Sequence, residues 1–312
     1  MSRRVVFHEF GGVENLGLEQ APELAAGPGQ VLVRVVYAGL NPSDLRIVAG
    51  TFFIVPDLPS GCGNDFSGVV AGVGAGVEEV VVGDLVFGGR RLAAAADYLL
   101  ASPRDLHLVP AGLGLDVAGG LQIAGTTAVA GVRAIDPSED ETVFVSGAAG
   151  GVGVLAAQLS RACGARVIGS ASPANFDFLR ALGVIPVDYE AGMWDRLREL
   201  APAGISAAYS TRGIDEVNGL LNFGVSASRI NAVAAGSTAG ELGVHTDGSA
   251  AALPDDLDRL ARALAAGDIM LPIDSVYSLD AAQAAYRRLA AGHLRGKILL
   301  STADVRNAAG LM

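Results

Sequence analysis

Hydrophobic and polar positions follow two different periods along the chain. Up to about residue 110, apolar residues alternate with polar ones or form short β-branched runs, as in Arg4–Phe7 and Val31–Tyr37, with glycine or proline at the ends. The valine- and glycine-rich segment Ser67–Gly88 and the segment Leu99–Val109 continue this pattern. Glycine supplies the positive φ angles that tight turns between paired strands need. The pattern predicts a small, barrel-like β module.

Helical spacing alternates with short strands in the rest of the chain. It predicts helices over 116–135, 176–182, 194–200, 257–266 and 281–291, with Asp116 as the cap of the first. It predicts strands over 207–210, 229–234, 274–277 and 297–301. Because strands and helices alternate, we expect a parallel, doubly wound sheet and an α/β fold overall.

One stretch, Val143–Gly169, has the length and order of a strand–helix–strand unit. Its turn reads Ala148-x-Gly150-x-x-Gly153. Gly150 would let the backbone approach a pyrophosphate, and Gly153 would let the helix pack closely on the strand. The free N–H groups of the helix N-terminus would then face the phosphates. The predicted cofactor-binding residues of this turn are Gly150, Gly151, Val152 and Gly153. The competing interpretation is a glycine-rich turn that binds nothing.

Composition narrows the possible classes of function. The chain has 312 residues, of which 51% are hydrophobic, so two domains with large cores are expected. The formal net charge of −11 and the lack of a basic run disfavour binding to nucleic acid. The two cysteines, Cys62 and Cys163, cannot form a disulfide framework. No apolar run is long enough to span a bilayer. We therefore expect a cytoplasmic protein with a small-molecule substrate and no membrane partner.

Four motifs give the chain a family resemblance. They are Gly-Leu-Asn-Pro-Ser-Asp at 39–44, the Gly68 to Asp84 segment, Gly-Ala-Ala-Gly-Gly-Val-Gly at 147–153, and Gly-Lys-Ile-Leu-Leu at 296–300. In this order they resemble the medium-chain dehydrogenase/reductase superfamily, in its zinc-free quinone oxidoreductase (zeta-crystallin-like) and enoyl reductase branch. The resemblance implies a GroES-like catalytic domain over 1–118 and 273–312 and a Rossmann domain over 119–272. It also implies an active site in the cleft and a homodimer, for which the candidate sheet edge is Arg229–Ala234.

The residues at the metal positions of this family indicate that zinc is absent. Zinc-dependent relatives carry a cysteine where Asn41 stands and a histidine where Asn64 stands. Amide side chains are poor ligands for Zn²⁺, which prefers thiolate, imidazole and carboxylate. The four-cysteine lobe of those relatives has no counterpart here. We therefore predict no metal site, and hydride transfer that relies on positioning and electrostatics.

The choice of nucleotide is predicted from the segment after the second strand of the unit. It holds no Asp or Glu for a ribose 2′-hydroxyl, which argues against NAD. Ser170, Ser172 and Asn175 could donate hydrogen bonds to a 2′-phosphate. The resemblance adds Tyr189, alternatively an ordinary strand-end aromatic, and Lys297 as a weaker contact. NADPH-using relatives often have a cation near position 175, so the asparagine there predicts weak binding of NADPH. NADPH is the predicted cofactor, and NADH is the alternative.

The predicted catalytic residues are Asn41, Asp44, Phe52 and Thr127. Enoyl reductase relatives carry a tyrosine, thought to be the proton donor, where Phe52 stands, and a phenyl ring cannot donate a proton. Many quinone reductases need no protein acid, because water can protonate a hydroquinone. By resemblance, Asn41, Asp44 and Thr127 lie near the nicotinamide. Alternatively, Asn41 and Asp44 only cap a helix that begins near Pro42, and Thr127 lies inside a helix.

Two further features remain open. Relatives usually have acidic residues where Ser206 and Ser210 stand, and this change either reshapes the nicotinamide pocket or has no function. Cys62 lies near the cleft by resemblance, but the sequence nominates no base beside it, so a packing role is favoured over a nucleophile.

Together these features predict a zinc-independent, NADPH-dependent reductase. It would transfer hydride to a quinone or to an α,β-unsaturated carbonyl compound, aromatic or polyketide-like in view of the apolar cleft. One alternative is a cyclase or isomerase that keeps its cofactor without net redox change. The other is a nucleotide-binding protein without catalysis, as some lens crystallins are.

Overall fold

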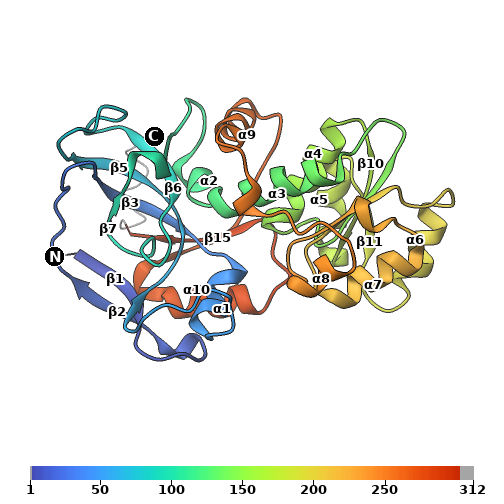
Figure 1. Ribbon diagram of the computed structural model, residues 1–312, viewed down its shortest axis with the longest axis horizontal. Helices are drawn as coiled ribbons and strands as arrows, with labels where there is room; N and C mark the ends of the chain where they lie inside the picture. The colour runs from blue at the N-terminus through green and yellow to red at the C-terminus, as the bar shows by residue number, and fades with distance from the viewer. Residues whose placement is uncertain (1, 303–312) are drawn as a thin grey trace.

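The computed structural model describes residues 2–302, which form a β-rich half and an α/β half. In Figure 1 the β-rich half lies on the left and the α/β half on the right, with α3 and α9 between them. Strands from the start and the end of the chain meet in the β-rich half. The predicted α/β class, with a β-rich module beside a doubly wound sheet, is confirmed.

Two sheets build the β-rich half. The three-stranded sheet has the order β2-β1-β4, with β1 (Ser2–Phe7), β2 (Leu16–Ala21) and β4 (Ser60–Gly61). The seven-stranded sheet consists of β3 (Val31–Gly39), β5 (Asp65–Val73), β6 (Leu85–Gly89), β7 (Tyr98–Ala101), β8 (Leu106–Leu108), β14 (Ile273–Ser278) and β15 (Lys297–Ser301). Buried positions largely alternate with half-buried ones along β3, as the sequence pattern predicts for a strand with one face on a core.

The end of the chain completes this half. Strand β15 pairs antiparallel with β3, with Leu299 opposite Gly39, and parallel with β14. Helix α10 (Ala282–Ala290) packs its buried face, which includes Tyr286, into the same core. The predicted limits of this domain include residue 1 and residues 303–312, which lie outside the described part of the chain.

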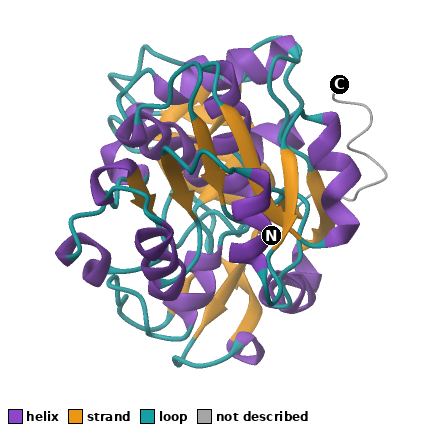
Figure 2. Ribbon diagram, turned by 90° about the vertical axis from the view of Figure 1, so that its right-hand side faces the viewer, coloured by secondary structure: helices purple, strands orange, loops and turns teal. Residues whose placement is uncertain are grey.

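The α/β half is a five-stranded parallel sheet with the order β11-β10-β9-β12-β13. Its strands are β9 (Thr142–Val145), β10 (Arg166–Ala171), β11 (Ile185–Asp188), β12 (Ala207–Ser210) and β13 (Ile230–Ala232). Helices cover both faces of the sheet (Figure 2). This strand order is that of dinucleotide-binding folds, whose ligands bind at the carboxyl ends of the strands where the order reverses. That point lies between β9 and β12.

The other helices are α1 (Pro42–Val48), α2 (Leu115–Gly119), α3 (Gln122–Ile135), α4 (Gly151–Ala162), α5 (Phe176–Ala181), α6 (Met193–Leu200), α7 (Ile214–Phe223), α8 (Ser237–Glu241) and α9 (Asp256–Ala266). The prediction of one helix over 116–135 was wrong, because α2 and α3 are separated at Gly120 and Leu121. Two consecutive glycines weaken a helix. Here they also allow β3 to approach, since a Cβ at Gly119 would lie 2.9 Å from the Cβ of Tyr37 in that strand.

The predicted sheet edge at Arg229–Ala234 contains β13 (Ile230–Ala232), which is the last strand of the five-stranded sheet. Its outer side is nevertheless partly covered, by an isolated bridge between Asn231 and His245. The Ala232 N–H donates to the carbonyl of His245 at 2.8 Å, and the His245 N–H donates to the carbonyl of Ile230 at 2.9 Å. The segment around His245 therefore covers part of the edge that was expected to join two subunits. The homodimer stays a prediction.

None of the helices within residues 2–302 combines the length and the apolar character that a membrane span requires.

Candidate active site

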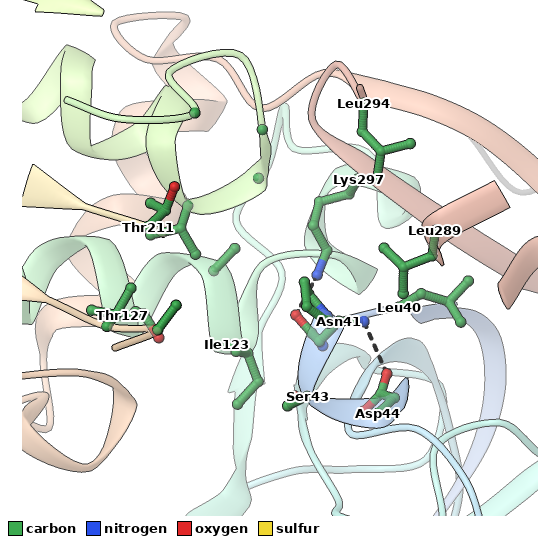
Figure 3. Close-up of a pocket in the computed structure, with 18 of the residues that line it drawn as sticks. Leu40, Asn41, Ser43, Asp44, Ile123, Thr127, Thr211, Leu289, Leu294 and Lys297 are labelled. Atoms are coloured by element: carbon green, nitrogen blue, oxygen red, sulfur yellow. Dashed lines mark hydrogen bonds between the residues drawn. The ribbon is translucent and has the colours of Figure 1, made fainter. Parts of the chain in front are cut away.

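A cavity of about 1120 Å³ lies between the two halves. Both halves contribute to its walls, and Figure 3 shows side chains from α1, α3, α10 and β15 converging on it. Of the sequence-predicted site residues, those that line it are Asn41, Asp44, Phe52, Thr127, Gly150, Gly151, Val152, Gly153, Ser172, Asn175, Tyr189 and Lys297. Their roles stay predictions, and their surroundings decide what each can do.

The glycine turn forms one wall of this cavity. Strand β9 ends before it, Gly147 has a positive φ of 57°, and α4 begins at Gly151 with Gly150 as its cap. A Cβ at Gly153 would meet the carbonyl oxygen of Gly147 and lie 2.7 Å from its carbonyl carbon. The first N–H groups of α4 have no partner inside the helix. The turn is therefore a compact cradle in which backbone donors face the cavity, and it fits a pyrophosphate.

Ser170 does not belong to the ligand-facing wall. Its side chain is fully buried, and its Oγ accepts a hydrogen bond from the Gly147 N–H at 3.1 Å. The prediction that it contacts a 2′-phosphate was therefore wrong. Ser170 instead fixes the start of the glycine turn from the neighbouring strand.

Basic side chains lie beside the end of the cavity at Asn175 and Tyr189. Arg212 and His293 line the cavity, and Arg295 lines an adjoining pocket that shares Asn175 with it. The Arg295 Nε donates to the Asn175 Oδ1 at 3.0 Å. The Tyr189 hydroxyl lies 2.6 Å from His293 Nδ1, and the Arg212 guanidinium lies over the tyrosine ring, 4.5 Å from its centroid. The cation that the sequence lacks at position 175 thus comes from distant segments. No spacing signal marked Arg295, which stands two residues before Lys297.

Lys297, the single lysine of the sequence, was predicted to contact the adenosine phosphate, but its ammonium group lies elsewhere. Its side chain is buried, and its Nζ donates to Asn41 Oδ1 at 2.6 Å and to Asp65 Oδ2 at 3.3 Å. Its stem runs past the glycine cradle, since a Cβ at Gly151 would lie 2.8 Å from its Cδ. The prediction that Lys297 contacts an adenosine phosphate was wrong, because Asn41 and Asp65 hold the ammonium (Figure 3).

Asn41 and Asp44 do cap α1, and they line the cavity as well. The Asn41 N–H donates to Asp44 Oδ2 at 2.9 Å (Figure 3), while the Asn41 side chain accepts from Lys297. Both residues are buried. The pKa of Asp44 is raised to about 7, chiefly by burial and in part by the nearby Asp65, while the Asn41 N–H, Lys297 and Tyr286 oppose the shift.

This pKa predicts a pH-dependent stability. Because the pKa of folded Asp44 is raised from 3.8 to about 7, the native state binds more protons than the unfolded state in that window, and stability falls as pH rises through it. Each pKa unit corresponds to about 1.4 kcal/mol. We expect Asp44→Asn to reduce the loss of stability between about pH 5 and about pH 8, measured by denaturant unfolding. An unchanged loss of stability in the variant would contradict the assignment of this pH dependence to Asp44. The titratable groups that face Asp44 are Asp65, Lys297, Tyr286 and Cys62.

Phe52 and Thr127 both line the cavity. The Phe52 ring is half-buried, with the Arg46 guanidinium 5.2 Å from its centroid. Thr127 is buried in α3, and its carbonyl accepts from the Tyr209 hydroxyl at 2.7 Å. Thr127 thus lies inside a helix, as one interpretation of the sequence predicts, and it also lines the cavity. Its proximity to a nicotinamide stays a prediction.

The serine at position 210 is paired with a carboxyl group from the next helix. The Ser210 hydroxyl donates to Glu216 Oε1 at 2.7 Å, and both side chains are buried. Burial raises the pKa of Glu216. The neighbouring Thr211 lines the cavity and donates its N–H to Ser146 Oγ at 2.7 Å. Glu216 therefore restores, from another position, an acidic group beside the carboxyl end of β12.

Metal ligands do not gather in this site. Among residues 2–302 no group of three or more His, Cys, Asp and Glu side chains could hold a metal ion. Asn64 donates its amide to Asp65 at 3.0 Å, and the Asn41 oxygen accepts from Lys297. Amides engaged in this way do not fit a zinc centre. The absence of catalytic zinc stays a prediction that rests on these side chains.

Comparison with known proteins places this site in a family. The family model of the alcohol dehydrogenase GroES-like domain matches residues 27–128, and the model named zinc-binding dehydrogenase matches residues 187–300. The quinone oxidoreductase of Pseudomonas aeruginosa is 31% identical in an alignment that covers 96% of this chain and 99% of that protein. The chain belongs to the medium-chain dehydrogenase/reductase superfamily of oxidoreductases.

Other members of this superfamily match to different extents. The structure of the quinone oxidoreductase from Coxiella burnetii superposes with a TM-score of 0.87 at 27% identity, over 97% of this chain and 99% of that one. The NADPH-dependent alkenal/one oxidoreductase of Arabidopsis thaliana is 32% identical over 59% of this chain, and the synaptic vesicle membrane protein VAT-1 homolog of Rattus norvegicus is 31% identical over 68% of it. The matched regions span 51% and 54% of those two proteins.

Proposed function

We propose that the protein is a zinc-independent reductase that uses NADPH to reduce quinones and α,β-unsaturated carbonyl compounds. The observation that carries this proposal is the continuous cavity that joins the glycine cradle to Asn41, Phe52 and Thr127. A dinucleotide bound in the cradle would supply a hydride at the apolar end of the cavity. The similarity to a quinone oxidoreductase and to an NADPH-dependent alkenal/one oxidoreductase supports both substrate classes.

Different residues of the protein would bind the pyrophosphate, a ribose hydroxyl or the substrate carbonyl, and the apolar part of the substrate. The N–H groups of Gly151, Val152 and Gly153 would bind the pyrophosphate, with the stem of Lys297 packed beside Gly151. Asn41, held by Lys297, would orient a ribose hydroxyl or the substrate carbonyl. Apolar side chains near Phe52 would exclude water from the substrate. The cavity includes both polar and apolar groups that such a division needs.

The proposal is tested by incubating the purified protein with NADPH and a panel of quinones and enones. Loss of NADPH absorbance in step with loss of the acceptor, and a product heavier by two hydrogens, are the expected results. A product of unchanged mass would favour a cyclase or isomerase. Tight binding of NADPH without turnover on any acceptor would favour a binding protein that has lost catalysis. Either result would contradict the reductase.

The preference for NADPH is proposed to depend on Arg295. We expect Arg295→Ala to raise the KM for NADPH about 10- to 100-fold, because a hydrogen bond to a charged group contributes about 1.5–3 kcal/mol. The KM for NADH should change far less, since NADH lacks the 2′-phosphate. The ratio of the two KM values separates loss of this charge from general loosening of the loop. Arg180→Ala is the matched control, because Arg180 is exposed on α5 and pairs only locally with Asp177. An unchanged ratio in the Arg295 variant would contradict the assignment.

A further inference from the structure

The substrate end of the cavity raises the question of where a proton comes from. Reduction of a C=C bond conjugated to a carbonyl needs a hydride at one carbon and a proton at the other. Phe52 supplies none, and Lys297 is held between Asn41 and Asp65. Among the described residues that line the cavity near Phe52, Cys62 and Asp44 also carry exchangeable protons.

These two side chains are linked through a third. The Cys62 Sγ lies 3.0 Å from the Tyr286 hydroxyl. Tyr286 and Asp44 also shift each other's pKa, so the carboxyl group lies near this pair. Cys62 follows β4, Asp44 lies on α1, and Tyr286 lies on α10. All three are buried, and Tyr286 is fully enclosed. Three buried groups that can carry a proton therefore lie together behind the cavity wall at Cys62, and a hydrogen bond joins the first two.

We propose that Cys62 is the proton donor for the reduction of enones, and that Tyr286 and Asp44 return the proton to it. This proposal rests on the reductase function proposed above. Once hydride has reached the β-carbon of the substrate, the Cys62 S–H bond breaks and a C–H bond forms at the α-carbon. The thiolate then takes the hydroxyl proton of Tyr286, whose oxygen takes the proton of the Asp44 carboxylic acid. Asp44 regains its proton from water, so no further oxidant or reductant is needed.

The environment suits each group to this role. Burial, with the negative charge of Asp44, raises the pKa of Cys62 to about 12, so the thiol stays protonated and is not an active nucleophile. The pKa of Asp44, about 7, lets it gain and lose a proton near neutral pH. A thiolate left in this buried position is unfavourable, which favours its immediate reprotonation. If Cys62 had only a packing role, its substitution would not change the turnover of enones relative to that of quinones.

A comparison of two hydride acceptors, an enone and a quinone, tests the proton donor independently of hydride transfer. An enone needs protonation at carbon, which is slow without a positioned acid, whereas the oxygens of a reduced quinone take protons from water. We expect Cys62→Ala and Cys62→Ser to lower the ratio of enone to quinone turnover about 100-fold or more, in the range of a lost general acid. The serine variant keeps a hydroxyl for Tyr286 but is a far weaker acid, so it also controls for packing. Cys163→Ala is the matched control, because Cys163 is exposed and remote from the cavity lining.

A second measurement needs neither cofactor nor substrate. In a Cys163→Ser background, the rate at which iodoacetamide alkylates Cys62 reports the thiolate fraction. Asp44→Asn removes the charge that opposes the thiolate, so alkylation at alkaline pH should become faster. Tyr286→Phe removes a hydrogen bond that stabilises the thiolate, so alkylation should become slower. A cysteine coupled to neither residue would react at the same rate in all three proteins.

The outcomes are distinct. A lowered ratio in both Cys62 variants, with alkylation that responds to residues 44 and 286, supports the relay. An unchanged ratio, or a ratio that falls in Asp44→Asn but in neither Cys62 variant, overturns it and leaves the reductase standing. Oxidation of NADPH by neither acceptor in the unmodified protein overturns the reductase itself, and with it the step assigned to Cys62.

Discussion

Replacing Lys297 with methionine is expected to lower the free energy of unfolding by about 3–5 kcal/mol, because it leaves a buried carboxylate without its cation. The Asp65 side chain is fully buried, and its Oδ2 lies 3.3 Å from Lys297 Nζ. The remaining partners of Asp65 are the N–H of Ile123 and the amide of Asn64, which carry no charge. Methionine keeps most of the side-chain stem that packs beside Gly151. The loss of unfolding free energy therefore reports mainly the removal of the charge and only slightly the removal of side-chain volume. Equilibrium unfolding in guanidinium chloride is the measurement.

A double-mutant cycle isolates this pair. Asp65→Asn together with Lys297→Met removes both charges, and we expect it to recover part of the stability lost in the single variant. Arg198→Met is the surface comparison, since Arg198 and Asp195 are both exposed and such pairs contribute about 0–1 kcal/mol. A loss below about 1 kcal/mol in Lys297→Met would contradict the expectation that the buried Asp65 carboxylate depends on the charge of Lys297.

Replacing Gly153 with alanine is expected to lower the affinity for NADPH about 100-fold, the effect of displacing a positioned group by about 1 Å. The added Cβ would meet the Gly147 carbonyl oxygen and lie 3.0 Å from the Cα of Ala148. These are backbone atoms that no side-chain rotation can move, so the turn itself must shift and the donors of α4 move with it. Overpacking of this kind also costs about 1–3 kcal/mol of stability. Isothermal titration with NADPH measures the affinity, and thermal unfolding measures the stability.

Gly240→Ala is the matched control for the glycine cradle. Gly240 lies in α8, on the same half of the molecule, and a Cβ there would meet nothing within 4 Å. We expect its affinity for NADPH to equal that of the unmodified protein. Equal affinities in Gly153→Ala and Gly240→Ala would refute the assignment of the glycine turn as the cofactor cradle.

The prediction from sequence succeeded where short-range patterns determine structure. The strand–glycine turn–helix order of Val143–Gly169 depends on neighbouring residues, and β9, α4 and β10 occupy it as expected. It fell short where the chain folds back on itself. The break between α2 and α3 depends on the approach of β3, and the partly covered edge of β13 depends on His245. Short-range patterns of residues do not predict contacts between segments that are distant in the sequence.

The sequence by itself determined the fold class, the position of the glycine cradle and the amides at the two zinc positions, because each is a property of residue type and short spacing. Only the tertiary structure decided how charges are distributed over the cavity. It brings Arg295 to Asn175, places the single lysine between Asn41 and Asp65, and brings Tyr286 within hydrogen-bond distance of Cys62. These partners are more than 100 residues apart in several cases, as Asn175 and Arg295 are at 120. Electrostatic and hydrogen-bond interactions depend on distance in space, and that distance exists only once the chain has folded.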